Sequence, residues 1–189
     1  LDSIIWMAEG RKYEEVVLMT ASLARLLRQS ISNEDEVVPL AREVEYAKGY
    51  LTIQKMRYKD KLEFEIDVEP SILNIPLIKL VLQPIIENAI YHGLKYKESK
   101  GLLQVKGFMK DGNAVLQVID NGVGMDEETL SHIYDKHKVN YHSNGVGVYN
   151  VQKRLKLYYG ENYGITYESE KGVGTTATIT IPGIQEESI

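Results

Sequence analysis

Apolar residues recur every three or four positions along the first third of the chain, the spacing that one face of a helix gives. Over residues 12–31 the stripe consists of Val16, Met19, Leu23, Leu26, Leu27 and Ile31. A shorter helix is expected before it, from about Asp2 to Gly10. A second stripe, over residues 40–58, consists of Leu40, Val44, Ala47, Leu51, Gln54 and Tyr58. This spacing fits two helices that pack on a neighbouring core and equally fits a dimerising helical bundle.

The period changes from helical to alternating after Asp60. Leu62, Phe64, Ile66 and Val68 alternate with acidic residues, which predicts a half-buried strand. A helix is expected to begin at Pro76, with a buried face made of Leu77, Leu80, Val81, Ile85 and Ala89. Pro84 lies inside that pattern and predicts a kink or a restart of the helix, because proline lacks the amide that closes the preceding turn.

The pattern of the second half predicts strands, turns and two further helices. Two strands are expected first, over residues 102–109 and 114–120, joined by a hairpin-type turn. A short helix over 126–134, with Asp126 as its N-cap, and a polar loop over 135–144 follow. The last expected elements are a helix that begins at Gly145 and Gly147 and ends at Gly160, and strands over 164–169 and 175–181. The apolar stripe of the last helix is Val148, Val151, Leu155 and Tyr158. Residues 185–189 are expected to form a loose tail.

The composition is that of an ordinary globular protein: 189 residues, 43% hydrophobic and 26% charged, with no cysteine. Disulfide frameworks, Cys-ligated metal sites and Walker-type phosphate loops are excluded, since neither cysteine nor Gly-Lys-Ser/Thr occurs. The formal net charge of −5, with no block dense in Lys or Arg, argues against nucleic-acid binding. No stretch of about 18 residues is apolar enough to cross a bilayer, so no membrane contact is expected of this chain. It begins at Leu1 rather than Met, which we interpret as a cytoplasmic piece of a longer protein whose membrane segments can lie upstream.

Four short segments are candidates for chemistry: Glu87-Asn88, Asp120-Asn121-Gly122-Val123-Gly124, Gly145-Val146-Gly147 and Gly172-Val173-Gly174-Thr175. Each alone has an ordinary structural explanation. Asn-Gly is a strong signal for a tight turn, and paired glycines often precede helices, although backbone amides at a helix start also suit phosphate. Glu87 and Asn88 interrupt an otherwise apolar helix, where an unpaired polar group costs about 1–3 kcal/mol unless that face reaches solvent.

In combination, the four segments resemble the N box and the first, second and third glycine boxes of one ATP-binding domain. Sensor histidine kinases, gyrase-type ATPases, the heat-shock chaperone of that superfamily and mismatch-repair ATPases share this domain. The flanking stretches, residues 40–58 and LVLQPIIENAIYHGL, are similar to sensor histidine kinases of the LytS/YesM type. The resemblance implies a two-layer α/β sandwich, in which helices cover a mixed, mostly antiparallel sheet. It also implies a truncated helical dimerisation and phospho-acceptor region over residues 1–58, an ATP-binding catalytic domain over 59–184 and a tail over 185–189.

The same resemblance implies roles for individual residues, with ATP and Mg²⁺ as the expected cofactors. The residues expected to bind them are Asn88, His92, Asp120, Gly122, Gly124, Gly145, Gly147 and Thr175. Asp120 is expected to accept a hydrogen bond from the adenine amino group, Asn88 to ligate Mg²⁺, and Glu87 to act as the catalytic base or orienting group. Residues 135–144 are expected to form the lid.

One position departs from the family pattern. Many histidine kinases carry a basic residue three positions after the N-box asparagine, where this chain has Tyr91. His92, Lys95 and Lys138 are the candidates to replace that phosphate contact, and the sequence does not choose among them. Three further histidines are interpreted as surface residues: His132, His137 and His142.

By this resemblance the chain is the catalytic portion of a two-component sensor histidine kinase, which transfers the γ-phosphoryl group of ATP to a histidine for relay to a response regulator. In the family the acceptor histidine lies a few residues before the position of Leu1, so this chain alone is expected not to phosphorylate itself. The full-length protein is expected to be a homodimer anchored in the cell membrane. The alternatives are an ATP-gated interaction module and a related ATPase or serine kinase of the same superfamily.

Overall fold

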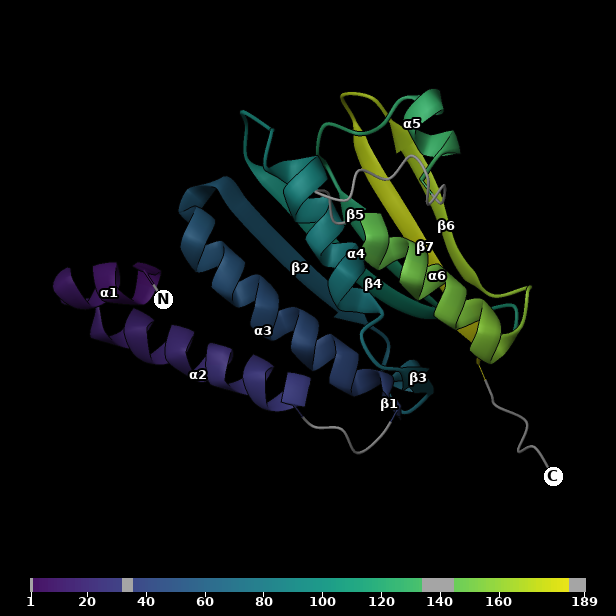
Figure 1. Ribbon diagram of the computed structural model, residues 1–189, viewed down its shortest axis with the longest axis horizontal. Helices are drawn as coiled ribbons and strands as arrows, with labels where there is room; N and C mark the ends of the chain where they lie inside the picture. Colours follow the sequence, from purple (N-terminus) through teal and green to yellow (C-terminus); the bar gives the residue numbers. More distant parts are fainter. Residues whose placement is uncertain (1, 32–35, 134–144, 184–189) are drawn as a thin grey trace.

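The computed structural model describes residues 2–31, 36–133 and 145–183, whose arrangement Figure 1 shows. The helices of the first third lie where the apolar stripes predict them: α1 is Asp2–Glu9, α2 is Tyr13–Ile31 and α3 is Leu40–Tyr58. The stripe of α3 faces inward, because Leu40, Ala47 and Leu51 are at most 1% exposed. The spacing of this stripe fits packing on a neighbouring core or a dimerising bundle, and in the structure α3 packs on the core.

The centre of the molecule is a five-stranded sheet in the order β2-β4-β5-β7-β6. Its strands are β2 Leu62–Val68, β4 Gly101–Lys110, β5 Asn113–Asp120, β6 Gly164–Glu170 and β7 Gly174–Pro182. β2 runs parallel to β4 and the other neighbours are antiparallel, so the sheet is mixed and mostly antiparallel, as predicted. The turn between β4 and β5 has positive φ at Asp111 (50°) and Gly112 (77°), the backbone conformation of a tight hairpin.

The segment from Pro76 to Pro84 differs from the prediction. Pro76 begins a short strand, β3 (Pro76–Ile78), and not a helix; this strand pairs with β1 (Val37–Pro39), which the sequence analysis did not predict. Proline is compatible with the first position of a strand, where its missing amide breaks no ladder. The helix α4 (Leu82–Asn88) begins only at Leu82, so Pro84 lies in its first turn, where a missing amide is tolerated. The chain continues as a π-helical segment, η3 (Ala89–Leu94).

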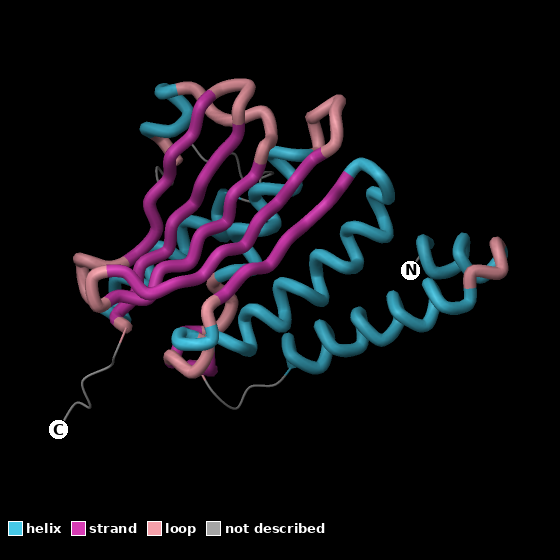
Figure 2. Tube along the Cα trace, turned by 180° about the vertical axis from the view of Figure 1, so that it is seen from behind, coloured by secondary structure: helices cyan, strands magenta, loops and turns pink. Residues whose placement is uncertain are grey.

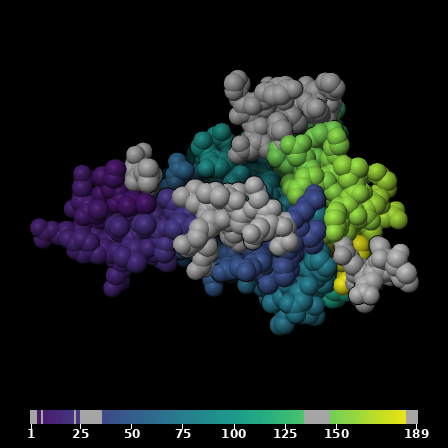
Figure 3. Space-filling view, turned by 60° about the horizontal axis from the view of Figure 1, so that its bottom comes forward, coloured from purple at the N-terminus to yellow at the C-terminus, as the bar shows by residue number. Residues whose placement is uncertain are grey.

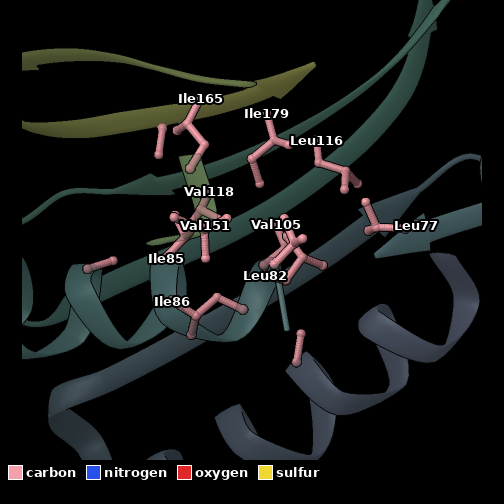
Figure 4. Close-up of a cluster of buried hydrophobic side chains, with 14 of the residues drawn as sticks. Leu77, Leu82, Ile85, Ile86, Val105, Leu116, Val118, Val151, Ile165 and Ile179 are labelled. Atoms are coloured by element: carbon pink, nitrogen blue, oxygen red, sulfur yellow. The ribbon is translucent and has the colours of Figure 1, made fainter. Parts of the chain in front are cut away.

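Three helices, α3, α4 and α6 (Gly145–Tyr159), cover one face of the sheet, and Figure 2 shows the strands from the opposite side. The hydrophobic core lies between the two layers. Figure 4 labels ten of its side chains: Leu77, Leu82, Ile85, Ile86, Val105, Leu116, Val118, Val151, Ile165 and Ile179. The molecule is thus the two-layer α/β sandwich that the sequence predicts.

The apolar stripe of α6 is confirmed at Val148, Val151 and Leu155, which are at most 2% exposed. The assignment of Tyr158 to this stripe is wrong, because Tyr158 is 45% exposed and Tyr159 packs against the core instead. The Tyr159 hydroxyl accepts a hydrogen bond from the Ile78 amide (3.2 Å) and donates one to the Pro76 carbonyl (3.1 Å). These two hydrogen bonds fix the end of α6 against β3.

Helices α1 and α2 form a hairpin that extends beyond the sandwich at one end, with α2 alongside α3 (Figures 1 and 3). Among the described side chains of this hairpin only Met7 and Met19 are buried, and none belongs to the core cluster of the sandwich. Leu40 and Leu51 of α3, in contrast, are members of that cluster. The predicted domain boundary at residue 58 stays a prediction, and the packing of α3 favours a unit that begins near residue 36.

Candidate functional site

A small cavity lies between the helical run formed by α4 and η3 and the strands β5, β6 and β7. Its volume is about 40 Å³, and it is lined by Ile85, Asn88, Ala89, His92, Gly93, Val118, Asp120, Gly124, Met125, Tyr167, Thr175 and Ala177. Five residues that the sequence analysis selects therefore meet in one place: Asn88, His92, Asp120, Gly124 and Thr175. Three of the four candidate segments, which are distant in the sequence, converge there.

Asp120, the last residue of β5, is the buried charged group of this cavity. It is 6% exposed, and its Oδ1 accepts a hydrogen bond from the Gly122 amide at 2.8 Å. Burial raises the pKa of Asp120 to about 6, against the opposing effects of the Gly122 amide and of the Lys97 charge. A carboxylate removed from water in this way gains strongly from any N–H donor that enters the cavity.

The glycines around Asp120 allow three backbone segments to approach closely. A Cβ on Gly93 would lie 2.6 Å from Asp120 Oδ1, and a Cβ on Gly122 would lie 2.4 Å from the Gly93 backbone carbon. Gly124 has a φ of 62°, and a Cβ there would lie 1.9 Å from the Glu170 carbonyl oxygen. A side chain at Gly122 or Gly124 would clash with the neighbouring backbone, so the packing of these segments requires glycine at both positions.

Thr175, the second residue of β7, pairs with Asp120, and a residue that the sequence analysis missed fixes its position. Ser169 Oγ lies 2.8 Å from Thr175 Oγ1 and accepts a hydrogen bond from the Met125 amide at the same distance. Its hydroxyl also contacts the Gly174 carbonyl oxygen at 3.0 Å. Ser169 thus links β6, β7 and the loop after β5. No spacing in the sequence identifies it, because its role depends on the pairing of β6 with β7.

Glu87 and Asn88 are adjacent in α4 but have different surroundings. Asn88 lines the cavity, whereas Glu87 does not and accepts a hydrogen bond from Gln83 Nε2 at 2.9 Å. Both side chains are half-buried. The segment therefore supplies one polar group to the cavity and one beside it.

The candidates to replace the basic phosphate contact at the position of Tyr91 differ in their position relative to the cavity. His92 lines the cavity, and partial burial, followed by the charge of Lys95, lowers the pKa of its imidazole, which favours the neutral form. Lys95 lies outside the cavity with its Nζ 5.7 Å from the centroid of the Tyr96 ring. Lys138 lies outside the described residues. Tyr91 hydrogen-bonds with Tyr50 of α3 and does not line the cavity.

Lys97 is a second residue that the sequence analysis missed. Its Nζ donates a hydrogen bond to the Asn121 carbonyl, and its charge acts on the neighbouring Asp120 carboxylate. The Asn121 side chain in turn accepts a hydrogen bond from the Leu102 amide at 2.8 Å. A positive charge is therefore fixed directly behind the strand end that carries Asp120.

The second glycine box lies next to the cavity without lining it. Gly145 is the first residue of α6, and a Cβ on Gly147 would lie 3.4 Å from Pro84 Cβ, so the start of α6 packs against the first turn of α4. The preceding helix, α5 (Glu127–Ser131), has Asp126 as its N-cap, as predicted; the carboxylate accepts from the Thr129 amide at 3.0 Å. The expected lid over residues 135–144 lies outside the described residues.

A larger hollow, of about 500 Å³, lies over the opposite face of the sheet, where Leu102, Ile119 and Thr176 contribute to it. It shares Asp120 and Thr175 with the first cavity, but it contains none of the residues of α4. The smaller cavity is the better candidate, because polar groups from several segments converge in it.

The residues present fit a magnesium ion that a ligand brings with it. In the part of the chain that the structure describes, no three His, Asp or Glu side chains cluster as a metal site. Mg²⁺ usually binds through one or two protein oxygens together with phosphate oxygens and water. The side-chain oxygen of Asn88 meets that requirement at the wall of the cavity.

The sequence matches the family described as "Histidine kinase-, DNA gyrase B-, and HSP90-like ATPase" over residues 74–185. The chain belongs to this histidine kinase-like ATPase family. A second family, described as "Histidine kinase", matches residues 1–62. The two matches together cover residues 1–62 and 74–185.

Curated relatives in the family are sensor kinases. Sensor histidine kinase YesM of Bacillus subtilis is 32% identical over 182 residues, which cover 96% of this chain and 30% of YesM. Sensor protein LytS of Oceanobacillus iheyensis is 34% identical over 143 residues, which cover 74% of this chain and 24% of LytS. The predicted resemblance to the LytS/YesM type is confirmed, and the chain spans less than a third of the length of these relatives.

Solved structures of histidine kinases share the fold. The catalytic domain of histidine kinase ThkA superposes with a TM-score of 0.61 at 14% identity, covering 79% of this chain and 99% of that domain. The histidine kinase domain of the blue-light activated kinase EL346 from Erythrobacter litoralis superposes with a TM-score of 0.57 at 16% identity. The superposition covers 89% of this chain and 74% of that domain. None of the helices in the described ranges has the length and apolar character of a membrane span.

Proposed function

We propose that this chain binds Mg²⁺-ATP in the cavity between α4 and β5 and acts as the catalytic portion of a sensor histidine kinase. The observation that carries the proposal is the cavity that joins Asp120 to Asn88. In it, an acceptor suited to an amino group and an oxygen suited to a hard cation are held by one rigid scaffold. Membership of the histidine kinase-like ATPase family makes ATP the matching ligand.

The base of the nucleotide occupies the Asp120 end. The Asp120 carboxylate accepts a hydrogen bond from the adenine amino group, and Thr175 holds the far edge of the base, directly or through water. A cavity of about 40 Å³ is smaller than ordinary ligand pockets of about 300–1,000 Å³, so the rest of the nucleotide extends past α4.

The phosphates lie at the Asn88 end. When bound with the nucleotide, Mg²⁺ neutralises charge on the phosphoryl group that is transferred. Asn88 holds that ion through its side-chain oxygen, while the amides of Gly145 and Gly147 at the start of α6 face the phosphates. His92 donates a hydrogen bond as a neutral imidazole, because its lowered pKa favours the uncharged form.

Glu87 acts on the attacking histidine. Its carboxylate orients the imidazole and accepts the proton that the ring loses as the nitrogen attacks the γ-phosphorus of ATP. The bond between the γ-phosphorus and the β,γ-bridging oxygen breaks, which gives ADP and a phosphohistidine. The phosphoryl group then passes to an aspartate of a response regulator. We place the acceptor histidine upstream of Leu1, in a longer, membrane-anchored protein.

Homodimerisation forms part of the proposal. Three apolar side chains of α2 are half or more exposed: Tyr13 (66%), Val17 (68%) and Leu18 (50%). An apolar helix face of this kind suits a second copy of the same helix. The longer protein is therefore expected to sediment as a dimer.

Titration calorimetry with Mg²⁺-ATP tests the nucleotide site. The Asp120→Asn variant should lose detectable binding, because one orientation of the amide presents a donor to the adenine amino group. Asp111→Asn is the matched control: it makes the same change of charge in the exposed turn at the other end of β5, and its affinity should equal that of the unchanged chain. Equal affinity in all three proteins would contradict the proposed site.

Labelling with γ-³²P-ATP tests the reaction. This chain alone should take up no acid-labile, base-stable label, whereas a version extended upstream to include the expected acceptor should do so. Glu87→Gln in the extended protein should slow labelling by roughly 10²-fold or more, since general-base catalysis contributes that much, and leave ATP affinity unchanged. Binding of ATP without labelling of the extended protein would favour the ATP-gated interaction module.

A further inference from the structure

Helix α3 contacts the helical run that carries Glu87 at two points, one at the start of α4 and one in its continuation η3, and neither point lines the proposed nucleotide cavity. The first is Glu43, a carboxylate that is 1% exposed. Its Oε1 accepts a hydrogen bond from the Leu80 amide at 2.8 Å, and its Oε2 accepts from the amides of Val81 (2.9 Å) and Leu82 (3.0 Å). One buried side chain of α3 therefore satisfies three successive backbone donors at the start of α4.

The backbone before α4 is shaped to receive this carboxylate. Leu80 has a φ of 60°, in the left-handed region, and Val81 follows with a right-handed conformation. Successive residues of opposite hand direct their amides into one concavity, which binds an anion. No side chain of α4 caps its own amino end, and Pro84 has no amide to offer in the first turn. The carboxylate of Glu43 therefore serves as the cap.

The second point is Tyr50, about two turns further along α3 and 9% exposed. Its hydroxyl hydrogen-bonds with the side chains of Tyr91 and Gln54. The Glu87 carboxylate is close enough to contribute, after burial itself, to raising the pKa of the Tyr50 hydroxyl. The contact between Tyr50 and Tyr91 therefore joins α3 to η3, the continuation of the helix that carries Glu87.

We propose that Glu43 and Tyr50 are positioning residues, which set the placement of α4 and thereby of Glu87 relative to the bound nucleotide. The inference rests on the proposed function, because it assigns Glu87 a part in phosphoryl transfer. Helix α2 packs along α3, so the helix that makes these two contacts also touches the α1–α2 hairpin. The nucleotide-binding carboxylate, Asp120, belongs to β5 and is not held by either contact.

This separation predicts a loss of rate with little loss of affinity. In the extended protein that contains the acceptor histidine, Glu43→Gln places an amide nitrogen against the backbone amides of residues 80–82 and shifts the start of α4. Tyr50→Phe removes the hydrogen bond to Tyr91 and keeps the size of the ring. Both variants should lower the phosphorylation rate at saturating ATP by about tenfold or more, because small displacements of a reacting group reduce rates steeply. Their affinity for Mg²⁺-free ADP, which needs Asp120 of β5 but not the metal contact of Asn88, should stay within about threefold.

Matched controls are available close by. Glu45→Gln makes the same chemical change two positions along α3, at an exposed side chain, and Tyr158→Phe removes an exposed hydroxyl. Both controls should keep the rate of the unchanged protein. If Glu43→Gln does not fold, Tyr50→Phe still tests the inference.

The possible results separate the two proposals. If the unchanged extended protein neither binds ATP nor becomes labelled, the proposed function fails. If it becomes labelled and the variants do so at the same rate, the positioning inference is wrong and the function stands. If rate, affinity and melting temperature fall together, the two residues act only on stability, and the inference is equally overturned.

Discussion

Asp120 illustrates at the scale of a single residue how a buried carboxylate can oppose the stability of the fold. The side chain is 6% exposed, and its pKa of about 6 lies above the ordinary value of 3.8 because burial disfavours the charged form. Folding at pH 7 must therefore bury a charge that the unfolded chain keeps in water. An adenine amino group would add a further hydrogen bond to the buried carboxylate.

The stability of the unliganded chain should depend on this group in a definite direction. Because the folded pKa is raised, the contribution of Asp120 is fully present below about pH 4 and is lost as the pH rises through about 6, a difference of up to roughly 3 kcal/mol. Asp120→Asn should therefore unfold at higher denaturant concentration than the unchanged chain at pH 7. The difference should shrink as the pH falls to 4.5. Urea unfolding at several pH values measures it, with Asp111→Asn as control; a difference that does not change with pH would contradict the expectation.

The sequence predicts only part of the site at this scale. Asp120, Gly122 and Gly124 are identifiable because they follow a strand in a fixed order, and the cavity does contain Asp120 and Gly124. Lys97 and Ser169 are not identifiable, since the first comes close to Asp120 only through a loop after η3 and the second through strand pairing. A role that depends on a tertiary contact leaves no periodic pattern.

At the scale of elements, the end of α6 shows how one hydroxyl can override an apolar pattern. Spacing selects Tyr158, yet the structure buries Tyr159, whose hydroxyl bridges the Pro76 carbonyl and the Ile78 amide. Burial raises the pKa of Tyr159 to about 12, so the hydroxyl remains a donor throughout the physiological range. The choice between adjacent tyrosines is made by two backbone groups about 80 residues earlier in the chain.

Removal of this hydroxyl should destabilise the sandwich. Tyr159→Phe leaves one buried backbone donor and one acceptor without a partner, which corresponds to about 1–3 kcal/mol of unfolding free energy. Tyr158→Phe is the matched control, because its side chain is 45% exposed, and should change stability by less than about 0.5 kcal/mol. Denaturant titration of both variants provides the comparison. Equal effects would show that the bridge contributes nothing.

Element prediction succeeds where a pattern is long and fails where it is short. The helices α2 and α3 and the strands of the main sheet have enough residues for their period to be visible. The strands β1 and β3 have three residues each and exist because they pair with one another. Their partner is about 40 positions away, so no local rule detects them and Pro76 is mistaken for a helix start.

At the scale of the whole molecule, the position of α3 decides what folds as a unit. The core cluster receives Leu40, Ala47, Tyr50 and Leu51 from α3, and its described members include none from α1 or α2. A boundary near residue 36 would keep this packing intact. The boundary at residue 58 that the sequence suggests would remove one of the helices that cover the sheet.

Two shortened chains distinguish these boundaries. A chain of residues 36–184 should unfold cooperatively and bind Mg²⁺-ATP like the longer one, because it retains α3 with its core side chains and Glu43. A chain of residues 59–184 should fail to fold, since it exposes the buried faces of β2 and α4 to water. Circular dichroism and thermal unfolding measure both. A folded 59–184 chain would support the later boundary.

The parallel pairing of β2 with β4 has a consequence for the order of folding. Two parallel neighbours need a crossover connection, and here the connection from Val68 to Gly101 contains β3, α4 and η3. The helix with Glu87 and Asn88 is thus tied at both ends to adjacent strands, which bring Leu62 next to Gly101 across a long loop. Closing such a loop is slow compared with forming a hairpin such as β4–β5. During refolding, nucleotide affinity should therefore appear in the last kinetic phase, after most of the antiparallel strand pairs have formed.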